Sequence, residues 1–99
     1  MSDFRERLIR MDGHNYSHIP CQDGIKMSVQ AHTFSYSTPR ALLDDPYEYE
    51  EFEVAFLKNG EFVDPFNNKD IADFGHDDVL GYIPVEEVQR MYDLLAIKE

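Results

Sequence analysis

The sequence is poor in cysteine, in long apolar runs and in basic residues. Its single cysteine, Cys21, excludes an intramolecular disulfide and a zinc site built from several cysteines, as is typical of a reducing compartment. No apolar run approaches the roughly 18 residues that span a bilayer, and the N-terminal MSDFRERLIR lacks the apolar core of a signal peptide. We therefore expect a soluble, cytoplasmic protein.

Basic residues are scarcest in the second part of the chain. Residues 1–40 contain five bases and four acids, whereas residues 41–99 contain four bases and sixteen acids, so the two parts carry +1 and −12 of the net charge of −11. Such an acidic chain repels phosphate backbones and anionic lipids. The composition argues against direct binding of nucleic acid or membranes and favours a basic protein as partner.

The chain has enough apolar material for one core. Its 99 residues are 42% apolar and 13% aromatic, which is more than disordered acidic tails contain. A chain of this length buries roughly two thirds of its unfolded surface and does not fill two cores. We expect residues 1–99 to form a single domain.

Apolar periodicity predicts an α+β fold. Alternation predicts strands over 25–36, 51–56, 61–63 and 79–83, with Asn59-Gly60 as a type I′ hairpin turn. Pro84 at a first turn and a stripe of apolar residues up to Leu95 predict a helix. A short helix is expected over 2–11, with Phe4, Leu8 and Met11 on one stripe, and irregular connections over 12–24 and 64–78. The expected architecture is a small antiparallel sheet of three to four strands with a C-terminal helix on one face.

Metal-binding patterns are incomplete. His14, His18 and Cys21 have the spacing H-x3-H-x2-C, but Pro20 breaks the helical phase and no fourth ligand lies nearby. The acidic loop after Asp64 has calcium-type ligands without the EF-hand spacing, and the DFG at 73–75 lacks the other kinase motifs. We expect no metal and no cofactor.

Catalytic patterns also lack a local signature. Cys21 with a histidine, or Ser35 and Ser37 with His32 and an acid, can be assembled, but no G-x-S-x-G accompanies them. We expect that the protein is not an enzyme.

The segment DDPYEYEEFE, residues 44–53, concentrates negative charge. It carries six carboxylates, two tyrosines and no base, and its periodicity predicts entry into a strand with the carboxylates on the solvent side. One interpretation is a charged strand edge that discourages pairing between sheets. The other is a carboxylate array along an extended backbone that mimics nucleic acid and binds an Arg- and Lys-rich groove, with the tyrosines supplying stacking. The candidate partner-binding residues are Asp44, Asp45, Tyr47, Glu48, Tyr49, Glu50, Glu51 and Glu53.

Arg40 is the only base between Lys26 and Lys58. It either pairs with neighbouring acids and holds its loop, or contacts an anionic ligand of nucleotide size together with Gln30 and Tyr36. The second interpretation keeps open an oligomeric sponge that sequesters a nucleotide signal.

Three segments carry a resemblance: DGIKMSVQAHTFSYSTPR at 23–40, YEEFEVAF at 49–56 and LGYIPVEEVQRMYDLL at 80–95. They are similar to a group of small uncharacterised bacteriophage proteins in which a D-G-x-x-[ML]-S-V-Q-A core leads to a Ser/Thr-Pro-Arg end, a V-E-V-type strand and a closing Y-[IV]-P-V-E-x-V helix. The acidic DDPYEYEE and the Asp/Asn loop after Asp64 depart from that pattern. The resemblance implies a phage origin, and it supplies no catalytic residues because that group has no established activity.

Small size and strong negative charge are also features of the inhibitors that phages direct against host nucleases, polymerases and CRISPR complexes, and by that analogy the chain resembles them. The leading expectation is a phage protein that binds and inhibits a basic, nucleic-acid-binding host protein in the bacterial cytoplasm. The alternatives are the nucleotide sponge and an accessory or virion structural protein.

Overall fold

The computed structural model describes residues 3–11, 13, 15–63 and 80–97. Within them, five antiparallel strands form one sheet, in which β1 pairs with β2, β2 with β3, and β3 with both β4 and β5. The strands are β1 (Ile19–Pro20), β2 (Ile25–Gln30), β3 (Glu51–Lys58), β4 (Glu61–Phe62) and β5 (Leu80–Pro84). The helical elements are the 3-10 turns η1 (Phe4–Arg7), η2 (Gln22–Gly24) and η3 (Pro46–Glu48), and the α-helix α1 (Val85–Leu95).

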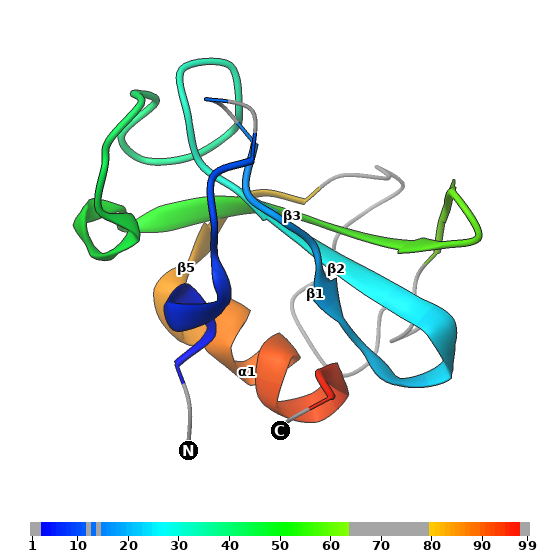
Figure 1. The fold of residues 1–99 in the computed structure, drawn as a ribbon. Helices are drawn as coiled ribbons and strands as arrows, with labels where there is room; N and C mark the ends of the chain where they lie inside the picture. Colours follow the sequence, from blue (N-terminus) through cyan, green and yellow to red (C-terminus); the bar gives the residue numbers. More distant parts are fainter. Residues whose placement is uncertain (1–2, 12, 14, 64–79, 98–99) are drawn as a thin grey trace.

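The α+β class is confirmed, because α1 packs against one face of the antiparallel sheet (Figure 1). β3 is the central strand, and its alternating side chains Phe52, Val54 and Phe56 are buried as the periodicity predicted. They share one core with the predicted helical stripe, whose fully buried members are Val88, Met91 and Tyr92. Each such apolar side chain stabilises the fold by about 1.5–3 kcal/mol.

The hairpin between β3 and β4 is also confirmed. Lys58 pairs with Glu61, and the two residues between them have positive φ, 55° at Asn59 and 81° at Gly60. These are the angles that a two-residue type I′ turn requires, and asparagine and glycine adopt them at the lowest cost.

The N-terminal helix is shorter than expected. Only Phe4–Arg7 are helical, because Leu8 already has an extended backbone at φ −88° and ψ 115°. Phe4 packs edge-on against Phe52 with ring centroids 5.4 Å apart, and Leu8 is buried, but Met11 is 70% exposed and does not continue the stripe. The irregular connection that follows contains β1, which the sequence did not predict.

The predicted strand over 25–36 is wrong in its second half. β2 ends at Gln30, and residues 31–37 form a loop in which the His32 N–H donates to the Ser35 hydroxyl and the Ser35 N–H donates to the His32 carbonyl. These local hydrogen bonds take the place of the hydrogen bonds that a strand would make with a neighbouring strand. The DFG triplet and the Asp/Asn loop lie outside the described residues.

Candidate functional site

The acidic segment is not an extended ribbon. Residues 46–48 form the turn η3, because the Asp45 carboxylate accepts a hydrogen bond from the Tyr47 N–H and Pro46 occupies the first position of the turn. An N-cap aspartate followed by proline is a strong local signal for such a turn. The predicted array along an extended backbone is therefore interrupted by a turn over residues 46–48, whereas the predicted entry into a strand is confirmed, because Glu51 and Glu53 lie in β3.

Tyr49 belongs to the core rather than to the surface. Its side chain is 2% exposed, and its hydroxyl donates to the Ala41 carbonyl and accepts from the Leu43 N–H. The Arg10 guanidinium also contacts this hydroxyl, at 3.3 Å. Tyr49 therefore anchors the segment to the fold and is not available for stacking on a partner.

Glu51 and Glu53 are half-buried and bonded within the chain. The Thr38 hydroxyl donates to Glu51 at 2.6 Å, and the Tyr36 N–H donates to Glu53 at 3.4 Å. Burial raises the pKa of Glu53, against the opposing effects of its bond to Tyr36 and of the Arg40 charge. These two carboxylates hold the loop that precedes β3, so they are not part of a freely accessible array.

The remaining predicted acids, Asp44, Asp45, Glu48 and Glu50, are exposed, and Asp45 and Tyr47 lie within electrostatic range of η1. The Arg5 guanidinium stacks on the Tyr47 ring at 4.3 Å from its centroid and forms an ion pair with Asp3 at 2.7 Å. Reduced hydration and the negative charges of Asp3, Glu6 and Asp45 raise the pKa of Tyr47, against the opposing effect of the Arg5 charge. We call this region the acidic surface; it consists of Asp3, Glu6, Asp44, Asp45, Tyr47, Glu48 and Glu50.

The start of α1 lies next to the acidic surface. The Val85 N–H donates to the Glu50 carbonyl, and the Phe4 N–H donates to the side chain of Gln89. In Figure 1 the turns η1 and η3 lie on the same side of the molecule as the beginning of α1. Asp3 and Glu6 were missed as site residues because nothing in the sequence indicates that η1 packs beside η3.

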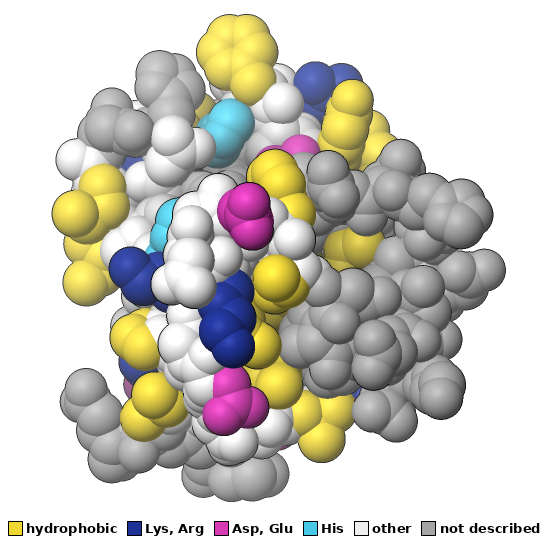
Figure 2. All heavy atoms as spheres, turned by 90° about the vertical axis from the view of Figure 1, so that its right-hand side faces the viewer, with side chains coloured by type: hydrophobic (Ala, Val, Ile, Leu, Met, Phe, Trp, Pro, Cys, Tyr) yellow, Lys and Arg dark blue, Asp and Glu magenta, His cyan; other side chains and the backbone are white. Residues whose placement is uncertain are grey.

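The acidic surface is largely uncompensated. Two ion pairs occur among the described residues, Arg5 with Asp3 and Arg90 with Glu87 at 4.0 Å. Neither includes Asp44, Asp45, Glu48 or Glu50. Figure 2 shows a different face, on which the described basic, acidic and apolar side chains are interspersed.

Two arginines of the N-terminal part are used inside the fold. Arg10 donates to the carbonyls of Ala31 and Leu43 and to the hydroxyls of Tyr16 and Tyr49, at 2.7–3.3 Å. Arg7 donates to the Tyr92 hydroxyl at 3.1 Å and to the Ile97 carbonyl at 3.3 Å. These bonds join both cations to neutral acceptors within the described part of the chain.

The predicted trio for an anionic ligand is not brought together as expected. Gln30 is buried, and its amide bonds to both backbone groups of Tyr16 and to Ser28. Arg40 and Tyr36 do meet, with the guanidinium 5.4 Å from the ring centroid. Of the two interpretations of Arg40, pairing with neighbouring acids is present only as an attraction to Glu53 and not as an ion pair among the described residues. Tyr82, which the sequence did not single out, lies beside Tyr36, with ring centroids 5.8 Å apart.

The residues considered for nucleophilic catalysis have structural roles. Ser35 and Ser37 are each 1% exposed, and their hydroxyls contact each other and the main chain. His32 accepts the Phe34 N–H at Nδ1. Burial raises the pKa of Cys21 to about 11, so its thiol is protonated at neutral pH and is a poor nucleophile.

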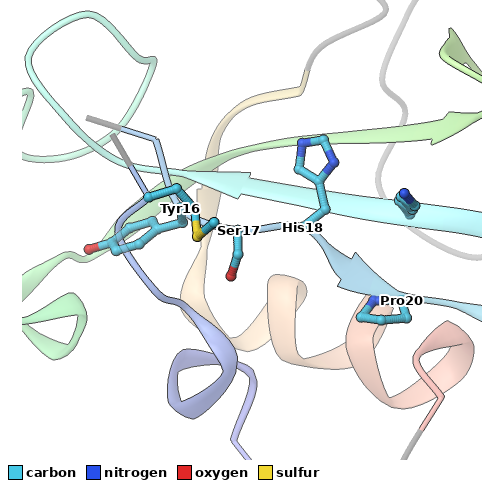
Figure 3. A pocket seen from close by; sticks show the side chains of 6 residues that line it. Tyr16, Ser17, His18 and Pro20 are labelled. Atoms are coloured by element: carbon cyan, nitrogen blue, oxygen red, sulfur yellow. The ribbon is translucent and has the colours of Figure 1, made fainter. Parts of the chain in front are cut away.

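An open hollow lies beside His18, on the segment that leads into β1. It encloses about 430 Å³ and is lined by Met11, Tyr16, Ser17, His18, Pro20 and Lys26. In Figure 3 the four labelled side chains, from Tyr16 to Pro20, point in different directions and do not converge on a common point. His14 lies outside the described residues, and in the part of the chain that the structure describes no three His, Cys, Asp or Glu side chains are grouped to hold a metal.

Comparison with known proteins adds no assignment: no family model, curated protein or solved structure matches the chain. In the described part of the chain, no helix has the length and apolar character needed to cross a bilayer.

Proposed function

We propose that this chain is a non-catalytic binding protein whose acidic surface docks on a basic face of a partner protein. The observation that carries the proposal is the exposure of four carboxylates that no described ion pair neutralises, on Asp44, Asp45, Glu48 and Glu50. A cluster of exposed like charges costs stability through self-repulsion, and a basic partner removes that cost while adding attraction.

The geometry supports a compact docking surface rather than a strip that follows a long groove. The carboxylates of Asp3 and Glu6 at η1 and of Asp45 before η3 lie within electrostatic range of Tyr47, which is 48% exposed. Tyrosine at the centre of a charged rim supplies apolar contact that the acids do not. Each close contact between an acid here and a partner cation is worth about 1 kcal/mol in water and up to about 4 kcal/mol where the interface excludes part of the water.

The partner that fits this chemistry is a protein whose basic face normally binds a phosphate backbone. We propose a bacterial nucleic-acid-binding protein, in keeping with the resemblance to phage proteins, and inhibition by occupation of its nucleic-acid-binding face in the cytoplasm. A nucleotide sponge is less well supported, because Gln30 is committed to Tyr16 and Ser28.

The proposal is tested with a tagged chain, a bacterial lysate and two matched variants. Glu48→Gln with Glu50→Gln removes two charges from the acidic surface. Asp23→Asn with Glu61→Gln removes two exposed charges at the other end of β3, where Glu61 pairs with Lys58. We expect the first variant to retain basic proteins about tenfold less than the unmodified chain at low salt, which corresponds to about 1.4 kcal/mol, and the second to retain them equally.

A retained protein is then purified, and its binding to nucleic acid is measured with and without the chain. Competition between the chain and nucleic acid is expected. Equal retention by the two variants, or simultaneous binding of chain and nucleic acid at one basic face, contradicts the proposal.

A further inference from the structure

Arg5 places a cation of the chain itself on the acidic surface. Its guanidinium donates two hydrogen bonds to the Asp3 carboxylate, from Nε at 2.9 Å and from Nη2 at 2.7 Å. Its central carbon lies 4.3 Å from the centroid of the Tyr47 ring. We call Asp3 and Tyr47 the guanidinium clamp. A carboxylate beside an aromatic face recognises arginine, because the planar guanidinium pairs with both carboxylate oxygens while its face stacks on the ring.

The turn η1 does not depend on this guanidinium. Its backbone is capped by the Asp3 carboxylate, which accepts the Arg5 N–H at 2.8 Å, and by the Glu6 side chain, which accepts the Asp3 N–H at 3.0 Å. Phe4 fixes the turn to the core, because its side chain is fully buried and its N–H donates to the side chain of Gln89. The Arg5 side chain can therefore leave the clamp while the turn stays in place.

The contacts that hold Arg5 are weak ones at a protein surface. The side chains of Arg5 and Asp3 are 20% and 31% exposed. A surface ion pair and an exposed cation–π contact each change an equilibrium by about two- to fivefold. Asp45 also lies within electrostatic range of Arg5 and Tyr47, so it attracts any cation that enters the clamp. A basic partner brings several cations to these acids at once, and so competes with a single internal one.

We propose that the guanidinium clamp selects arginine on the partner, and that Arg5 is the internal competitor that fills the clamp in the free chain. This inference rests on the proposed function of the acidic surface. When a basic partner docks, one of its arginines exchanges with Arg5 on Asp3 and Tyr47. A lysine exchanges less well, because an ammonium group does not pair with both carboxylate oxygens in one plane or stack on the ring.

Calorimetry with oligo-arginine and oligo-lysine peptides of equal length tests the exchange. Arg5→Gln and Arg90→Gln each remove one ion-paired cation, but only the first opens the clamp, because Arg90 pairs with Glu87 on α1. We expect Arg5→Gln to bind oligo-arginine about two- to fivefold more tightly than Arg90→Gln does. The corresponding gain for oligo-lysine is expected to be smaller.

Arg5→Lys separates the opening of the clamp from the change in charge. It keeps the net charge but loses the planar, two-point contact with Asp3, so we expect oligo-arginine to bind about twofold more tightly than to the unmodified chain. Circular dichroism checks the fold of every variant. Should Arg5→Gln lose structure, the comparison of Arg5→Lys with the unmodified chain decides in the same way.

Equal affinity of Arg5→Gln and Arg90→Gln for oligo-arginine, or weaker binding by Arg5→Gln, overturns the role of Arg5 as a competitor and leaves the proposed function standing. Equal gains for oligo-arginine and oligo-lysine overturn the selectivity for arginine. Binding of neither peptide by any of these proteins contradicts the proposed function, and this inference with it.

Discussion

At the scale of single residues, polar side chains decide where the loops lie. The side-chain amide of Gln30 bonds the backbone N–H and carbonyl of Tyr16, as a neighbouring strand would. The Asp45 carboxylate caps η3, and the Arg10 guanidinium donates hydrogen bonds to four oxygen acceptors. Of these, only the cap has a sequence signal, because an aspartate before a proline is a local pattern. The other two are long-range contacts that no local pattern contains.

Arg10 is expected to be the most important of these residues for stability. Arg10→Met keeps the aliphatic stem but leaves the carbonyls of Ala31 and Leu43 and the hydroxyls of Tyr16 and Tyr49 without this donor. We expect the free energy of unfolding, measured by urea denaturation, to fall by at least about 2–3 kcal/mol, since even one bond to a charged donor is worth about 1.5–3 kcal/mol.

Arg90→Met is the control for this prediction. Arg90 is 51% exposed at its side chain and lies 4.0 Å from Glu87, so its loss should change stability by less than about 0.5 kcal/mol. Equal effects of the two substitutions would show that Arg10 does not hold the loops.

At the scale of elements, the strands and the helix with clear periodicity were predictable. β3, β4, β5 and α1 follow from alternation, from the Asn59-Gly60 turn and from Pro84, all of which are local in sequence. β1 was not predictable, because two residues are too few to show an alternation of apolar and polar side chains. The strand is defined only by its pairing with β2, in which Ile19 lies opposite Met27. The end of β2 was also missed, since the alternation of apolar and polar residues continues into a loop that serine side chains stabilise.

The β3–β4 hairpin gives an element-scale prediction. Gly60 has a φ of 81° and open space around the position of a Cβ, so Gly60→Ala meets only the backbone penalty. We expect the free energy of unfolding to fall by about 1–2 kcal/mol. Glu61→Ala, one residue further along the same hairpin, lacks this penalty and should lower the free energy of unfolding by only a few tenths of that amount. A larger fall in the free energy of unfolding for Glu61→Ala than for Gly60→Ala would contradict the turn assignment.

At the scale of the whole molecule, charge is separated by the fold as well as by the sequence. Arg7 and Arg10 bond to carbonyls and hydroxyls, and the carboxylates of 44–50 stay at the surface. The sequence predicted that this segment concentrates charge. It did not predict that Tyr49, Glu51 and Glu53 are held by the fold, or that Asp3 and Glu6 join the acidic surface, because both depend on tertiary packing.

The salt dependence of binding is the most direct test of the claim that the acidic surface engages a basic partner. With a partner purified by the capture experiment, the dissociation constant is measured by calorimetry from low to high salt for the unmodified chain, for Glu48→Gln with Glu50→Gln, and for Asp23→Asn with Glu61→Gln. We predict that affinity falls steadily with salt, that the fall is shallower for the first variant, and that it is unchanged for the second. Affinity that is independent of salt, or equal slopes for all three proteins, would contradict the account.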